Sequence, residues 1–109
     1  MLTRNDLRPP FYANIFSYRA SNSRDGYDEA DEATLTAVRD VDGFLGYEVT
    51  GDGKRRIFIS YWRDLDAIDT WRRNRIHQHA KSHGKAWYDA YHSMVVKVES
   101  HSLWNPDLL

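Results

Sequence analysis

Apolar residues alternate or run without break in four segments of the chain, and recur at steps of three and four in two others. The first pattern predicts four strands, at residues 11–19, 44–50, 55–62 and 93–101. The second predicts two helices, at about residues 26–41 and 64–84, with a short helical turn at 86–92. The chain is therefore expected to alternate strands and helices within one folded unit.

Turn-forming residues predict where these elements begin and end. Asp64 is the expected N-cap of the second helix, and Gly84 is its expected C-terminal stop. Between the second and third strands, Asp52 and Gly53 predict a tight hairpin whose glycine adopts a positive φ angle.

The resulting order, β-α-β-β-α-β, predicts an α+β, ferredoxin-like fold: a four-stranded antiparallel sheet with both helices on one face. The strands carry apolar residues on both sides, as in the segment 11–19. The face without helices then needs a second layer to exclude water. We expect a second copy of the chain to supply it, so that the two sheets form a barrel in a homodimer.

The second helix changes character along its length. At 100° per residue one stripe starts apolar and ends polar, with Trp71 and Arg75 on its edge and His77 pointing away. The stripe comprises Leu65, Ile68, Arg72, Ile76, His79 and His83. A helix that only packs on a core would continue with apolar residues, so its second half is a candidate ligand wall.

Composition narrows the classes of partner. The 109 residues suit one domain, at 11–101, preceded by a flexible arm at 1–10 and followed by a tail at 102–109. With 15 basic and 16 acidic residues, the chain lacks the basic excess of a nucleic-acid or membrane-surface protein. It has no cysteine, no run near the ~20 apolar residues of a membrane span and no signal-peptide core. We expect a cytoplasmic protein.

The sequence lacks the standard catalytic motifs, so candidate chemistry rests on single residues. Asn14 is an amide within an apolar strand, and it either pairs with a neighbour or faces a substrate. His79 and His83 share a helix face, but no carboxylate lies in phase to complete a metal site, so no metal is predicted. Arg75 either lies solvated, stacks or pairs with an acid, or binds an anionic group. The aromatic residues Trp62, Trp71, Trp87 and Tyr88 are either core or the wall of a cavity.

Several of these residues stand at spacings that resemble the antibiotic biosynthesis monooxygenase family. The likeness covers about residues 11–101. It rests on Gly26-Tyr27, Gly43-Phe44-Leu45-Gly46, Tyr61-Trp62, Ala67-Ile68, Trp71, His77, Ala80, Gly84-Lys85, Trp87-Tyr88 and Tyr91. The resemblance implies a dimeric α/β barrel, which agrees with the pattern of strands and helices.

Two activities are implied by the resemblance. Some members oxidise polycyclic phenols to quinones with molecular oxygen and no cofactor. Others bind and degrade haem, and Asn14 and Trp71 match two of their positions, whereas Lys81 stands where an iron-ligating histidine is expected. Many relatives have no demonstrated activity.

We therefore expect a cofactor-independent monooxygenase acting on an aromatic or quinol-like small molecule. The predicted catalytic residues are Asn14, Trp71 and His79, with His79 or Arg75 steadying a phenolate. The predicted substrate-binding residues are Trp62, Arg75, Trp87 and Tyr88. The alternatives are a haem-binding or haem-degrading monooxygenase and a non-catalytic small-molecule-binding dimer.

Overall fold

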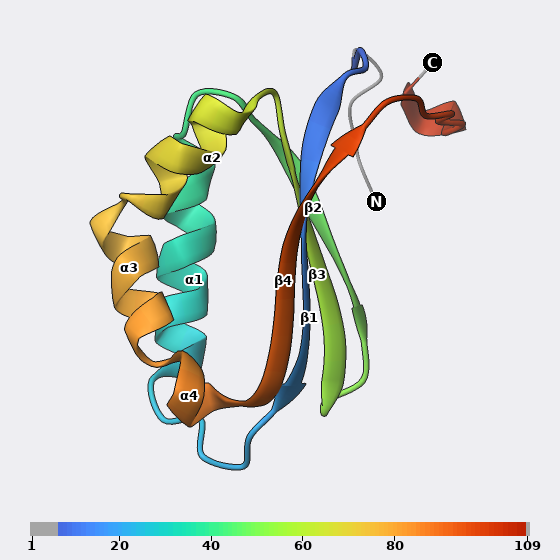
Figure 1. Ribbon diagram of the computed structural model, residues 1–109. Helices are drawn as coiled ribbons and strands as arrows, with labels where there is room; N and C mark the ends of the chain where they lie inside the picture. Colours follow the sequence, from blue (N-terminus) through green and yellow to red (C-terminus); the bar gives the residue numbers. More distant parts are fainter. Residues whose placement is uncertain (1–6, 109) are drawn as a thin grey trace.

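The computed structural model describes residues 7–108, and it has the predicted two-layer architecture (Figure 1). One layer is a four-stranded antiparallel sheet in the order β2-β3-β1-β4. Its strands are β1 (Phe11–Ala20), β2 (Phe44–Gly51), β3 (Arg55–Trp62) and β4 (Tyr88–Val98). The helices all lie on one side of this sheet, which confirms the ferredoxin-like prediction.

The other layer contains four helices instead of the two predicted. They are α1 (Tyr27–Val38), α2 (Leu65–Arg72), α3 (Arg75–Ser82) and α4 (Gly84–Trp87). The predicted second helix is interrupted after Arg72, because the Asn74 side chain accepts hydrogen bonds from the backbone N–H groups of Ile76 and His77. Asn74 thus begins a new helix as its N-cap, where the sequence pattern had suggested one continuous element.

The fourth strand also begins earlier than predicted. The helical turn expected at residues 86–92 is confined to α4, and β4 follows at once from Tyr88. α3 ends at Ser82 with His83 as its C-cap, so the helix stops at Gly84 as predicted. However, Gly84 is also the first residue of α4 and is not among the glycines with positive φ.

The predicted hairpin between β2 and β3 forms, but the residues that make its turn are Gly51 and Asp52. The positive φ belongs to Gly51, at 127°, and a Cβ there would lie 2.2 Å from the carbonyl oxygen of Arg55. The Asp52 carboxylate accepts hydrogen bonds of 2.7 Å from the backbone N–H groups of Lys54 and Arg55. A side-chain acceptor therefore replaces the backbone geometry expected of Gly53.

The main core lies between the sheet and the helices. Trp62 is its centre, with only 1% of its surface exposed, and it packs against Phe44 with ring centroids 5.2 Å apart. The other buried members come from the two neighbouring helices: Val38, Ala67, Ile68 and Trp71. Burial of these side chains holds α1 and α2 to the sheet.

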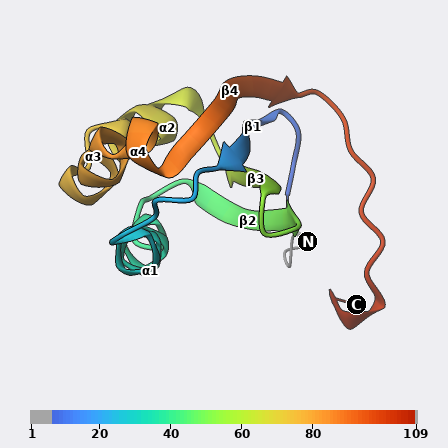
Figure 2. The same cartoon turned by 90° about the horizontal axis from the view of Figure 1, so that it is seen from below.

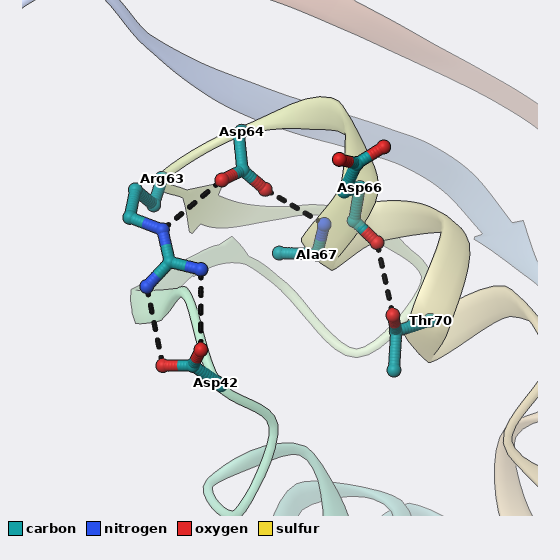
Figure 3. Close-up of polar contacts among 6 residues, drawn as sticks. All are labelled: Asp42, Arg63, Asp64, Asp66, Ala67 and Thr70. Atoms are coloured by element: carbon teal, nitrogen blue, oxygen red, sulfur yellow. Dashed lines mark hydrogen bonds and ion pairs between the residues drawn. The ribbon is translucent and has the colours of Figure 1, made fainter.

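A polar network fixes the start of α2 over this core (Figure 3). Asp64 caps the helix by accepting a 2.8 Å hydrogen bond from the backbone N–H of Ala67. Its other carboxylate oxygen lies 3.0 Å from Nε of Arg63, whose two terminal nitrogens contact Asp42 at 3.1 and 3.2 Å. These groups are largely exposed, so the ion pairs orient the two connections more than they stabilise them.

Within residues 7–108, one end of the sheet face away from the helices is covered. There Leu7 and Phe11 are buried together against Leu45, Tyr61 and Val98. The predicted flexible arm thus ends in a docked residue at Leu7, while residues 1–6 lie outside the described part of the chain. Elsewhere on this face Ile57 and Met94 are 40% and 39% exposed.

Beyond β4 the tail leaves the sheet, as Figure 2 shows. Trp104 is 76% exposed, and the tail ends, within the described residues, in a single helical turn at Pro106–Leu108.

Candidate functional site

The candidate site lies between the sheet and the helices, at the end of β3. Trp62 and Trp71 meet there with ring centroids 6.5 Å apart and planes inclined by 30°. Nε1 of Trp62 donates a 2.9 Å hydrogen bond to Oγ of Ser60, which satisfies its buried polar atom. The two tryptophans that the sequence singled out therefore form one aromatic wall.

His77 completes this wall. Its ring stacks on that of Trp71, with centroids 4.7 Å apart and an angle of 24°. The N-cap of α3 accounts for this contact, because restarting the helix at Asn74 makes His77 and Ala80, not Ile76 and His79, the half-buried residues of α3. The contact of His77 with Trp71 was not predictable from the helical spacing, which indicated one continuous helix over α2 and α3, although an Asn in mid-helix was a signal of the break.

The environment of His77 keeps its ring neutral. Burial lowers the pKa of His77 to about 4, aided by the positive charges of Lys81 and Arg72 and opposed by a hydrogen bond with the Trp71 backbone. Nδ1 of the ring is buried and has no hydrogen-bond partner. At neutral pH the wall thus includes an uncharged imidazole with one unused polar atom.

Asn14 lies on the same side of the sheet, opposite Ser60 in the pairing of β1 with β3. Its Nδ2 donates hydrogen bonds to the backbone oxygen of Met94, at 2.9 Å, and to Oγ of Ser93, at 3.1 Å. The Asn14 amide therefore forms hydrogen bonds with neighbouring residues, which is one of the two alternatives that the sequence left open. A catalytic role for Asn14 stays a prediction.

The second pair of predicted ring residues lies at the opposite end of the sheet. Trp87 is buried and donates a 3.0 Å hydrogen bond from Nε1 to the backbone oxygen of Asp25. Tyr88 packs against Tyr18 and Phe16, with centroids 4.8 and 5.2 Å away, and burial raises its pKa to about 12. These rings form a separate cluster, so Trp87 and Tyr88 do not join Trp71 in one site.

His79 and Arg75 do not face the aromatic wall. Both are exposed, and the His79 ring contacts that of His83, 5.0 Å away, which in turn stacks on Trp87 at 4.7 Å. The predicted placement of His79 beside Trp71 is wrong, because the break at Asn74 turns the stripe by one residue, or about 100°. The catalytic role of His79 and the substrate-binding role of Arg75 stay predictions, but the residue beside Trp71 is His77.

Unpartnered polar atoms mark the same interlayer space. Among the described residues, five buried side-chain nitrogen or oxygen atoms lack a hydrogen-bond partner. They are Nε and Nη2 of Arg24, Oγ1 of Thr34, Nε of Arg56 and Nδ1 of His77. Each of these atoms is buried, so water or a ligand is needed to complete its hydrogen bonds.

Comparison with known proteins agrees with this architecture. The family model of antibiotic biosynthesis monooxygenases matches residues 11–82. The uncharacterized protein YqjZ of Bacillus subtilis (strain 168) is 41% identical over 98 residues, which cover 88% of this chain and 86% of YqjZ. The chain therefore belongs to the antibiotic biosynthesis monooxygenase family.

Solved structures share the fold at low identity. SnoaB, a cofactor-independent oxygenase from Streptomyces nogalater, superposes with a TM-score of 0.70 at 9% identity, covering 84% of this chain and 96% of its own. Rv0793 from Mycobacterium tuberculosis superposes with a TM-score of 0.69 at 16% identity, covering 87% and 99%. At these identities the likeness concerns the fold alone.

None of the helices in residues 7–108 is long and apolar enough to cross a membrane. The same residues contain no group of three or more acidic or histidine side chains arranged to hold a metal ion. A cytoplasmic location and the absence of a cofactor stay predictions.

The lowered pKa of His77 predicts how stability responds to acid. An unfolded histidine binds a proton below about pH 6.5, whereas folded His77 does so only near pH 4. Between these values the unfolded state binds more protons, so acidification should cost on the order of 1 kcal/mol of unfolding free energy, after allowing for solvent screening. Urea titrations at pH 7 and pH 4.5 measure this difference.

The matched comparison is between two histidine variants. His77→Phe should lose less stability than the natural chain across this pH range, whereas the exposed His79→Phe should behave as the natural chain does. Equal pH dependence in the natural chain and His77→Phe would contradict the neutral, buried imidazole.

Proposed function

We propose that the protein is a cofactor-independent monooxygenase that oxidises a small phenolic or quinol-like compound between the helices and the sheet. The observation that carries this proposal is the neutral His77 stacked on Trp71, with its buried Nδ1 unpartnered. Membership of the family and the fold shared with SnoaB, a cofactor-independent oxygenase, support the same class of reaction.

In the proposed reaction, a phenol with an oxidisable ring carbon and one molecule of oxygen give a quinone and water. One oxygen atom enters the ring, and the other leaves as water with the two hydrogens removed from the substrate. The chain itself needs only to deprotonate the phenol, exclude water and hold the planar ring, since the phenolate supplies the electrons.

Each residue of the wall has a part in this scheme. His77 accepts the phenol proton at Nδ1, and the phenolate beside it favours the charged imidazole that its buried environment otherwise disfavours. The indoles of Trp62 and Trp71 hold the aromatic ring by stacking. Asn14 lies on the neighbouring strand and is the polar group placed to orient the substrate from the sheet side.

Haem, the alternative ligand, fits the described residues poorly. The position at which the resemblance implied an iron ligand is Lys81, which is exposed. His79 and His83 are exposed on α3, and the ring of His77 is stacked on Trp71. The imidazole beside the wall thus belongs to His77, four residues before the position that the resemblance implies for the iron ligand.

A non-catalytic binding module is the second candidate, and one observation favours it. A hollow of about 490 Å³ lies on the helix-free face of the sheet, lined in part by Ser17, Arg19, Arg55, Ile57 and His92. A ligand bound there would contact none of the wall residues. Saturable binding of a ligand with no oxygen consumption would favour this candidate.

Turnover of anthrone- and quinol-type compounds, followed as oxygen uptake, tests the proposed function. His77→Ala should lower kcat about a hundredfold or more, which is the usual contribution of a positioned acid or base. The exposed neighbour Gln78→Ala is the control and should keep the activity of the natural chain. Loss of turnover in His79→Ala but not in His77→Ala would contradict the assignment of the base.

We also propose that two copies of the chain pair through the helix-free face of the sheet. The centre of this face is apolar, with Ile15, Ile59 and Val96 half-buried beside the exposed Ile57 and Met94. Arg19, Arg55 and His92 lie toward one end of this face, whereas Glu48 pairs with Ile59 near its middle. Pairing of two sheets through the centre of the face would remove its apolar side chains from water.

The oligomeric state in solution tests this pairing. Light scattering coupled to size exclusion should give twice the chain mass for the natural protein and the single-chain mass for Ile57→Glu, which buries a charge at the centre of the interface. Leu65→Glu, a comparably exposed position on α2, should stay dimeric. A natural protein that elutes as a monomer at micromolar concentration would contradict the pairing.

A further inference from the structure

Two arginines stand at the end of the interlayer space remote from Trp71. Arg56 is at the start of β3, six residues or about 20 Å along the strand from Trp62. It pairs with Tyr18 across β1 and β3, so both side chains project toward the helices. Arg24 lies in the loop before α1, with its guanidinium carbon 3.6 Å from the centroid of the Tyr27 ring.

Three nitrogens of these guanidinium groups lack acceptors. Nε and Nη2 of Arg24 and Nε of Arg56 are buried and have no hydrogen-bond partner among the described residues. An arginine cannot lose its proton to relieve this situation, and each buried unpaired donor costs free energy. The stacking of Arg24 on Tyr27 offsets part of its charge but supplies no acceptor.

Two acids of α1 lie near these arginines. Burial and the neighbouring carboxylate of Asp28 raise the pKa of Asp31, while Arg56 and Arg24 lower it. The two acids balance the two guanidinium charges, so the unpartnered N–H donors, and not a net charge, are the feature that indicates a ligand.

The remaining neighbours are aromatic. Tyr18, Tyr27 and Tyr88 are mutual ring neighbours, with centroids 4.8 Å apart for Tyr18 and Tyr88 and 6.3 Å for Tyr27 and Tyr88. Phe16 adds a fourth ring, 5.2 Å from both Tyr18 and Tyr88. The groups at this end therefore combine cationic donors with flat apolar faces.

We propose that this end of the interlayer space binds the carboxylate of a small aromatic acid. A planar carboxylate supplies the oxygen acceptors that the guanidinium donors of Arg24 and Arg56 lack, and it can engage a guanidinium through two parallel hydrogen bonds. The attached ring packs among the tyrosines. The site rests on its own residues and does not depend on the proposed oxygenase activity.

Isothermal titration with benzoate tests this site, with benzamide as the neutral probe of the same shape and inorganic phosphate as the dianionic probe. Benzoate should bind saturably at millimolar concentration and at least tenfold more tightly than benzamide or phosphate. Arg56→Gln and Arg24→Gln should each weaken benzoate binding about tenfold or more, which corresponds to the loss of about 1.4 kcal/mol.

Arg39→Gln is the matched control, because Arg39 is exposed and follows the C-terminal end of α1, at the opposite end of this helix from Arg24. Its benzoate affinity should equal that of the natural chain. Circular dichroism melts identify any variant that fails to fold, and Arg24→Lys keeps the charge at that position should Arg24→Gln unfold.

Three results would overturn the proposal. They are the absence of saturable benzoate binding to the natural chain, an equal loss in Arg39→Gln and Arg56→Gln, and phosphate or benzamide binding as tightly as benzoate. Without saturable benzoate binding, water would be the partner of these donors. Phosphate or benzamide binding as tight as that of benzoate would show that the site has no preference for an aromatic carboxylate.

Discussion

The N-cap at Asn74 is the interaction on which the arrangement of the candidate site depends. By accepting hydrogen bonds from the backbone of Ile76 and His77, it ends the path of α2 and starts α3 at a new angle. The first inward residue of α3 is then His77, which stacks on Trp71. Without this break, a continuous helix would turn its polar stripe by about 100° and direct His79 toward the sheet.

The interlayer space is uneven in character, and this follows from which residues β3 sends toward the helices. At one end Trp62 packs in a cluster with Val38, Ile68 and Trp71, which makes this end apolar. At the other end Arg56 meets the loop and first turn of α1, where Arg24 and Asp31 introduce charge. Burying such groups without hydrogen-bond partners costs free energy, and a domain of this size has little stability to spare. The unpartnered donors are therefore the feature that packing alone explains least.

Much of the fold was predictable because strands that alternate or run apolar, and helices at three- and four-residue steps, leave a periodic signal. The first three strands begin and end within a residue of their predicted bounds. The Trp62 and Trp71 wall was also predictable, since both are large apolar rings near the junction of β3 and α2. The inward position of His77 was not predictable, because the N-cap at Asn74 changed which residues of α3 face the sheet. Arg24 and Arg56 escaped because their meeting depends on strand register and loop path, which carry no local pattern.

The contact between His77 and Trp71 is the central claim, and nuclear Overhauser effects between their ring protons test it most directly. With centroids 4.7 Å apart, strong cross-peaks between the two rings are expected, together with upfield shifts of the imidazole protons from the indole ring current. Cross-peaks from the His79 ring to Trp71, with none from His77, would show a continuous helix and contradict the account.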